Sequence, residues 1–181
     1  MSSEALIVVD LQRAFDDPGW GRRNNPACER NVARLVDDFR NRDETIVFVR
    51  HDSVEPGSPL APDQPGNAFK PELNGDADLL VTKHVNSAFL GDPDLDGWLK
   101  ERGIDRIAIC GIQTNMCCET TARMGGNLGY DVQFVLDATA TFDHTGPDGT
   151  TFDADTIARM TAANLHGEFA TVVSTEDYLK R

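Results

Sequence analysis

The sequence predicts an α/β fold with three layers, in which helices cover both faces of a six-stranded, mainly parallel sheet. Short, continuous apolar runs rich in β-branched residues alternate along the chain with segments whose apolar residues recur at helical spacing. Several of the apolar runs end directly in a charged residue, as the first does at Asp10. This alternation is typical of parallel strands joined by right-handed helical crossovers.

Each element follows from its local pattern. The run Ala5–Val9 shows the continuous apolar pattern of a strand buried on both faces. The predicted strands are 5–9, 45–49, 78–82, 106–110, 131–136 and 170–173. Helical periodicity or terminator residues predict helices at 27–42, 93–102, 115–127, 153–166 and 175–179. The segment 53–75 is too rich in proline and glycine for a regular element. We expect it to bind or cover a site, the alternative being a disordered excursion.

Length and charge limit the classes of function. The 181 residues fit one domain, 1–181, with a sizeable core. With 30 acidic and 17 basic side chains the net charge is -13, which repels nucleic acid and anionic membranes but tolerates a small neutral or cationic partner. The opening Met-Ser-Ser-Glu lacks the basic region of a signal peptide and no apolar run is long enough to span a membrane, so we expect a cytoplasmic protein.

The cysteines and histidines indicate free thiols and no metal. Cys117 and Cys118 are adjacent, and no Cys-x-x-Cys pair occurs among the cysteines at 28, 110, 117 and 118. The histidines at 51, 84, 144 and 166 stand far apart in sequence. A dedicated zinc site is therefore not expected, and neither is any other cofactor.

Candidate catalytic residues follow the predicted strands. Asp10 closes the first strand and Lys83 the third, and Gly111 opens a motif after the fourth; the carboxyl ends of strands in such sheets face ligands. Cys117 would lie in the first turn of the next helix, where a Thr114 N-cap and the helix dipole would lower the pKa of its thiol. Taken alone, Cys117 also fits a small buried hydrophobe, and Asp10 a surface residue that starts a loop.

Three separated blocks together resemble the isochorismatase-like cysteine hydrolase family. They are Val8-Val-Asp10-Leu-Gln12, Lys83-His-Val-Asn-Ser-Ala-Phe89 and Gly111-Ile-Gln-Thr-Asn-Met-Cys117-Cys-Glu-Thr-Thr-Ala-Arg123, followed by Gly129-Tyr130 and Asp137-Ala-Thr-Ala140. The match runs from about Ala5 to Val173. The resemblance implies a Rossmann-like fold and a catalytic triad of Asp10, Lys83 and Cys117. It also implies a cis peptide between Ile112 and Gln113, and from this we expect the N–H groups of Gln113 and Cys117 to form an oxyanion hole.

The resemblance further implies a mechanism. Asp10 would take the thiol proton, Lys83 would hold the carboxylate, and Cys117 would form a thioester that water then cleaves. Nicotinamidases of this family carry an Asp-x-His metal pattern that is not found at Arg50-His51-Asp52, and the isochorismatases proper lack the cysteine. Metal-independent hydrolysis of an amide, ureido or lactam C–N bond is therefore favoured, as in the carbamoylsarcosine and ureidoacrylate amidohydrolases.

Residues that flank these strand ends are expected to bind the substrate, a small molecule: Phe15, Trp20, His51, Asn86 and Phe89. Each fits core or loop packing equally well, and packing is the interpretation favoured for Met116 and Thr121. Family members often associate, so a homo-oligomer, a dimer or a tetramer, is expected. Two alternatives stay open: a catalytically silent family member that acts as a binding or scaffold protein, and a redox protein that uses Cys117 and Cys118.

Overall fold

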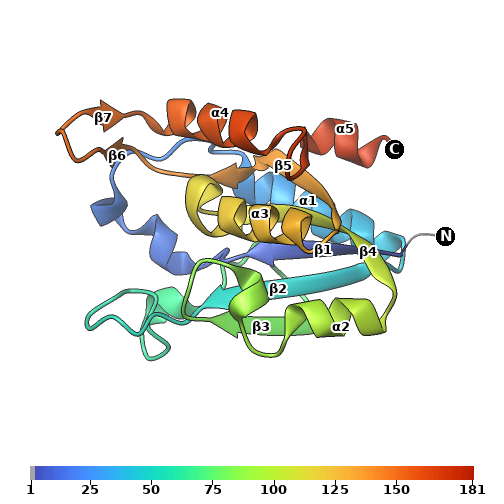
Figure 1. Ribbon diagram of the computed structural model, residues 1–181. Coiled ribbons are helices and arrows are strands. Elements are labelled where there is room, and N and C mark those ends of the chain that lie inside the picture. The colour runs from blue at the N-terminus through green and yellow to red at the C-terminus, as the bar shows by residue number, and fades with distance from the viewer. Residues whose placement is uncertain (1–2) are drawn as a thin grey trace.

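A parallel sheet of six strands forms the middle layer of the molecule, as the computed structural model of residues 3–181 shows (Figure 1). Met1 and Ser2, which begin the N-terminal segment considered above, lie outside the described residues. The strands are β1 (Ser3–Val9), β2 (Thr45–His51), β3 (Leu79–Lys83), β4 (Ile104–Ile112), β5 (Asp131–Ala140) and β8 (Thr171–Val173). Their order across the sheet is β3-β2-β1-β4-β5-β8, and every neighbouring pair is parallel.

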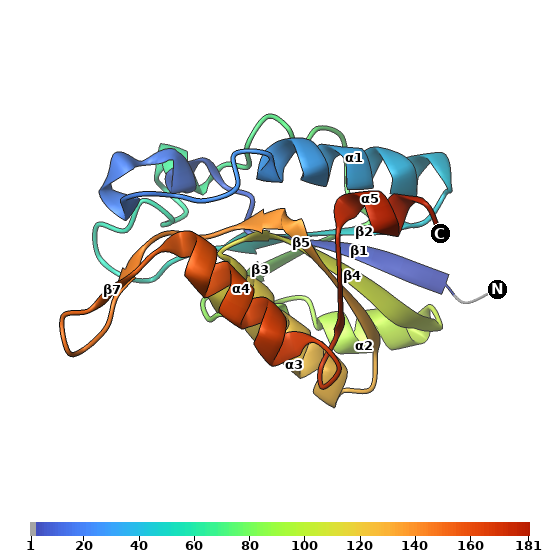
Figure 2. The same ribbon diagram turned by 90° about the horizontal axis from the view of Figure 1, so that it is seen from above.

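Helices cover both faces, which confirms the predicted three-layer α/β/α class. The helices are α1 (Cys28–Asn41), α2 (Leu95–Glu101), α3 (Glu119–Asn127), α4 (Ala154–Leu165) and α5 (Thr175–Leu179). Figure 2 shows α1 and α5 above the sheet and α2, α3 and α4 below it. None of the described helices combines the length and the apolar character that crossing a membrane requires.

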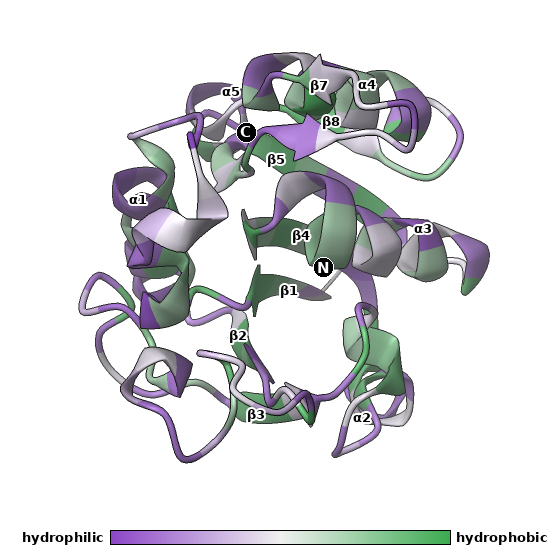
Figure 3. Cartoon of the chain, turned by 90° about the vertical axis from the view of Figure 1, so that its left-hand side faces the viewer, coloured by the Kyte–Doolittle hydropathy of each residue, from purple (hydrophilic) through white to green (hydrophobic). Residues whose placement is uncertain are grey.

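The core is divided by the sheet into two clusters. In β1, Leu6 and Val8 contribute to the cluster under α1, whereas Ile7 and Val9 contribute to the cluster under α2 and α3. This alternation follows from the period of two in a strand, and it explains why strands covered on both faces are apolar throughout. Viewed along the strands, β1 and β4 appear hydrophobic between α1 and α3 (Figure 3).

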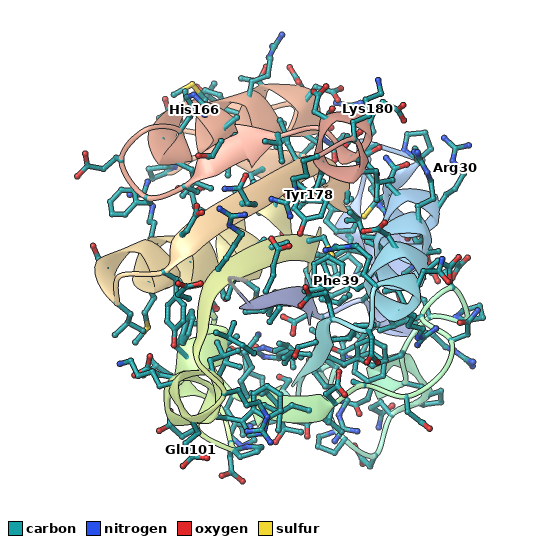
Figure 4. All side chains as sticks on the ribbon, turned by 90° about the vertical axis from the view of Figure 1, so that its right-hand side faces the viewer. Arg30, Phe39, Glu101, His166, Tyr178 and Lys180 are labelled. Atoms are coloured by element: carbon teal, nitrogen blue, oxygen red, sulfur yellow. The ribbon has the colours of Figure 1, made fainter. Side chains whose placement is uncertain are left out.

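The two helices of one face are joined by an aromatic contact. Phe39 of α1 stacks on Tyr178 of α5 with ring centroids 6.1 Å apart, and both side chains are buried (Figure 4). The predicted amphipathic face of α1 is the buried one, and it consists of Val32, Leu35, Val36 and Phe39. The short C-terminal helix is thereby fixed against the first helix of the chain.

Several features differ from the sequence-based expectation. Strands β4 and β5 continue to Ile112 and Ala140, beyond their predicted ends, and pair with each other at Gly111–Thr139 and Ile112–Ala140 after a register shift. A small antiparallel hairpin, β6 (His144–Thr145) and β7 (Thr151–Phe152), was not predicted. Its strands are two residues long, too short to show a period of two in the sequence.

Candidate active site

The catalytic residues predicted from the sequence meet where the strand order reverses. The chain proceeds from β1 to β2 and β3 on one side, and from β4 to β5 and β8 on the other, so the carboxyl ends of β1 and β4 flank the switch point where ligands bind in such sheets. Asp10 directly follows β1, and the turn that carries Cys117 follows β4. Lys83 is the last residue of β3 and reaches across β2 to Asp10.

Gly111 permits the close approach of β4 to β1 at this point. Its backbone has φ +123°, and a Cβ atom built there would lie 1.9 Å from the carbonyl oxygen of Val9, the residue before Asp10. No side chain larger than a hydrogen atom fits between the two strands. Glycine therefore begins the motif because the turn that carries Cys117 must start against the strand that precedes Asp10.

The segment of Cys117 is a π-helical turn, Thr114–Cys118, that leads into α3. The Thr114 hydroxyl donates to Thr139 Oγ1 at 2.8 Å and caps no helical N–H group, so the prediction of a Thr114 N-cap was wrong. The N–H groups of Met116 and Cys118 donate instead to the Gln113 carbonyl. The Ile112–Gln113 peptide is cis, as the resemblance implied.

Lys83 is the centre of the buried cluster. Its Nζ lies 2.6 Å from Asp10 Oδ2, 3.1 Å from His51 Nδ1 and 3.4 Å from Cys117 Sγ. The side chains of Lys83 and Asp10 are fully buried. Burial lowers the pKa of Lys83, but the Asp10 carboxylate and Cys117 raise it, and the net pKa is raised. Lys83 therefore stays a cation and pairs with the acid.

The surroundings of Cys117 raise the pKa of its thiol, contrary to the sequence-based expectation of a lowered pKa. Burial raises the pKa of Cys117, the Asp10 carboxylate raises it further, and the nearby Lys83 ammonium compensates only in part. Asp10 Oδ1 is buried without a hydrogen-bond partner among the described residues, and the ligand atoms of Asp10 and Cys117 lie within 4.8 Å of each other. One oxygen of the Asp10 carboxylate is thus left to accept a further hydrogen bond.

The raised pKa determines how the reactivity of Cys117 should respond to pH. An acid whose pKa is raised keeps its proton to higher pH, so the rate of Cys117 alkylation by iodoacetamide should still rise about tenfold per pH unit between pH 7 and pH 9. Peptide mass spectrometry after timed quenching measures the rate, with glutathione as the reference thiol. A plateau near pH 7 would show that the thiol is ionised at neutral pH and that its pKa is not raised.

Asp10, His51 and Cys117 are the described residues whose donor atoms are close enough to share a metal ion. The Lys83 ammonium, however, already lies within 3.4 Å of a donor atom of each of them. Two cations cannot share that position without strong repulsion. The donor set is thus arranged around an ammonium group and does not fit a resident metal.

A cavity of about 160 Å³ opens onto the thiol. The residues that line it are Asp10, Phe15, Trp20, His51, Leu60, Asn86, Gln113, Met116 and Cys117. Four of the five residues predicted to bind the substrate, Phe15, Trp20, His51 and Asn86, are among them. Phe89 is not, because its ring is buried and stacks on Tyr130 with centroids 5.6 Å apart. The structure places Phe89 in the core and brings Met116, interpreted above as packing, into the wall.

The long segment 53–75 is folded against the cavity. Leu60 lines the wall, and the Asn67 side-chain amide donates to the Leu60 carbonyl at 2.8 Å and to Asp52 Oδ1 at 2.9 Å. Gln12 joins the end of β2 to this segment. Its side-chain amide donates to the carbonyls of His51 and Asn67, and its side-chain oxygen accepts a hydrogen bond from the His51 N–H at 2.9 Å. These contacts agree with the covering role predicted for the segment.

Sequence reasoning missed Gln12 and Asn67 as organisers of the site. Gln12 was part of the first motif block and is fully buried, but a buried glutamine after a strand has no distinctive spacing. Cys118, the second thiol of the redox alternative, is fully buried in the core cluster under α3. The vicinal pair therefore offers one thiol to the cavity and one to the core.

A parallel α/β/α sheet with an acid, a lysine and a thiol grouped at the switch point is the arrangement of a hydrolase with a Rossmann-like fold. The chain belongs to the isochorismatase family, since the Isochorismatase domain model matches residues 4–177. The isochorismatase family protein YrdC of Bacillus subtilis is 40% identical over 177 residues, covering 97% of this chain and 94% of YrdC.

Two further proteins bear on fold and activity. A crystal structure of a hydrolase of the isochorismatase family from Chromobacterium violaceum matches with a TM-score of 0.94 and 39% identity, covering 98% of this chain and 92% of that one. The ureidoacrylate amidohydrolase RutB of Azorhizobium caulinodans is 30% identical over 171 residues, covering 75% of each chain. These likenesses confirm the resemblance and the fold class inferred from the sequence.

Proposed function

We propose that the protein is a cysteine-dependent amidohydrolase that cleaves an amide, ureido or lactam C–N bond of a small molecule. The observation that carries the proposal is the buried Lys83 ammonium, which lies within 3.4 Å of both the Asp10 carboxylate and the Cys117 thiol beside an open cavity. Membership of a family that includes an amidohydrolase supports it. The triad is Asp10, Lys83 and Cys117.

The first half-reaction uses Asp10 as base and then as acid. Because the resting thiol is protonated, Asp10 takes the proton as Sγ attacks the carbonyl carbon and the C–S bond forms. The N–H groups of Gln113 and Cys117 stabilise the oxyanion. The tetrahedral intermediate collapses, the C–N bond breaks, and Asp10 returns the proton to the departing nitrogen.

The second half-reaction regenerates the enzyme. Asp10 removes a proton from water, the water oxygen attacks the thioester carbon, and the C–S bond breaks as the thiol recovers its proton. Lys83 holds Asp10 in place throughout, and its positive charge balances the carboxylate at rest and the oxyanion while Asp10 carries the proton. The ammonium fills the position that a metal would need, so the reaction proposed is metal-independent.

The test is direct observation of the acyl-enzyme. The protein, incubated with a panel of small amides, ureides and lactams and quenched in acid, should gain the mass of the acyl group on the peptide that contains Cys117, and ammonia or amine should appear in solution. Chelator treatment should leave the rate unchanged. Absence of both product and acyl adduct across the panel would favour the catalytically silent alternative.

A further inference from the structure

None of the described residues that line the cavity at Cys117 offers a free cation to a substrate. The nine lining residues include neither arginine nor lysine. Lys83 reaches the thiol from behind the wall, but its side chain is fully buried and its ammonium is paired with Asp10 at 2.6 Å. Its charge is therefore already balanced by a carboxylate of the protein itself.

His51 is a neutral member of the wall. A lysine ammonium has only donors, so the 3.1 Å contact with Lys83 makes His51 Nδ1 the acceptor and leaves the ring proton on Nε2. Burial, followed by the Lys83 charge, lowers the pKa of His51, which keeps the ring uncharged at neutral pH. Two further polar residues of the wall, Asn86 and Gln113, have uncharged amide side chains.

Basic side chains of the surrounding segments are engaged elsewhere. Arg50 pairs with Asp52 at 2.7 Å, and Lys70 pairs with Asp16 and with Glu29. Arg13 lines a separate cavity and donates to the Phe69 carbonyl. A carboxylate placed beside Cys117 would thus be surrounded by Asp10, neutral amides and aromatic rings, in a protein of net charge -13.

We propose that this cavity selects a small amide that carries no carboxylate, with a flat or apolar part held against Phe15 and Trp20, an inference that rests on the proposed function. The rings of Phe15 and Trp20 lie 5.2 Å apart between centroids and form the apolar wall. A volume of about 160 Å³ equals that of about five water molecules, which limits the substrate to a small molecule. Leaving a buried charge unpaired should weaken binding of an acid about 10- to 100-fold relative to its neutral amide.

Binding can be measured without turnover. Trp20 lines the cavity, and the chain has two tryptophans, so a Cys117→Ala, Trp98→Phe variant reports the cavity through Trp20 fluorescence alone. Trp98 lies in α2 with Arg102 over its ring and does not line the cavity. The ligands are two size-matched pairs: succinamide with succinamate, and N-carbamoylglycinamide with N-carbamoylglycine. The neutral member of each pair should bind about 10- to 100-fold more tightly than the acid.

A variant with an added cation provides the matched control. Asn86 is exposed in the wall, so Asn86→Lys places a cation there at little cost to the fold, and it should reduce or reverse the preference. If the variant that keeps Asn86 bound the acids as tightly as the neutral amides, or more tightly, the inference would be overturned. Failure of both neutral amides to bind would overturn it as well. Ligand-observed NMR with Cys117→Ala alone gives the same ratio if the double variant does not fold.

The outcomes separate this inference from the proposed function. If acids and neutral amides at equal, low concentration formed the acyl-enzyme at equal rates, charge selection would be overturned and the amidohydrolase proposal would stay intact. Selective binding of the neutral amides without any acyl adduct on Cys117 would support charge selection and overturn the proposed chemistry.

Discussion

Replacement of Cys117 by alanine is expected to lower kcat/KM for amide hydrolysis about 10⁴- to 10⁶-fold, since covalent catalysis loses its nucleophile. The adjacent Cys118 supplies the matched control because it is fully buried in the core and lines no part of the cavity. Cys118→Ala should lower the free energy of unfolding by about 1 kcal/mol and leave kcat/KM within about threefold of the original value. Ammonia release and urea denaturation measure the two quantities.

The pattern across the two variants decides the assignment. Hydrolysis that survives Cys117→Ala would mean that another group attacks the carbonyl and that the thioester mechanism is wrong. An equal loss of activity in Cys118→Ala would mean that the π-helical turn is perturbed as a whole, so the result would not assign the nucleophile. The pair is informative because the two cysteines are adjacent in sequence, but Cys117 faces the cavity and Cys118 faces the core.

The fold was predictable because its strands are covered on both faces. Such strands are apolar at every position, as Ala5–Val9 is, and a charged residue at the end of the run then marks the edge of the sheet. Since the carboxyl ends of parallel strands share one edge, Asp10 and Lys83 were expected to converge although they are far apart in the chain. The 2.6 Å contact between them agrees with that expectation.

The details of the site were harder to predict because they depend on packing. The pKa of Cys117 reflects its burial as well as the helix start, and burial is a property of the folded structure. Phe89 lies close in sequence to Lys83, yet the short turn after β3 directs its ring against Tyr130 and away from the cavity. Gln12 and Asn67 act through contacts between segments that no local pattern specifies.

The Asp10–Lys83 pair is the point at which stability and catalysis are coupled. Lys83→Met should destabilise the fold by about 3–5 kcal/mol, because it leaves a fully buried carboxylate without its partner. Asp10→Asn combined with Lys83→Met should recover most of that loss, since the remaining groups are neutral. Activity should be lost in both variants, as neither retains the ionised acid together with the cation that positions it.

Urea denaturation and kcat/KM for the same set of variants test this expectation. The Lys100–Asp96 pair on the exposed side of α2 is the control: it has the same residue types at 2.7 Å, but 58% of the Lys100 side chain is exposed. Lys100→Met should cost no more than about 0.5 kcal/mol and leave activity unchanged. If Lys83→Met were as well tolerated as Lys100→Met, the buried ion pair would not contribute to stability as proposed, and the coupling of stability to catalysis at this pair would be wrong.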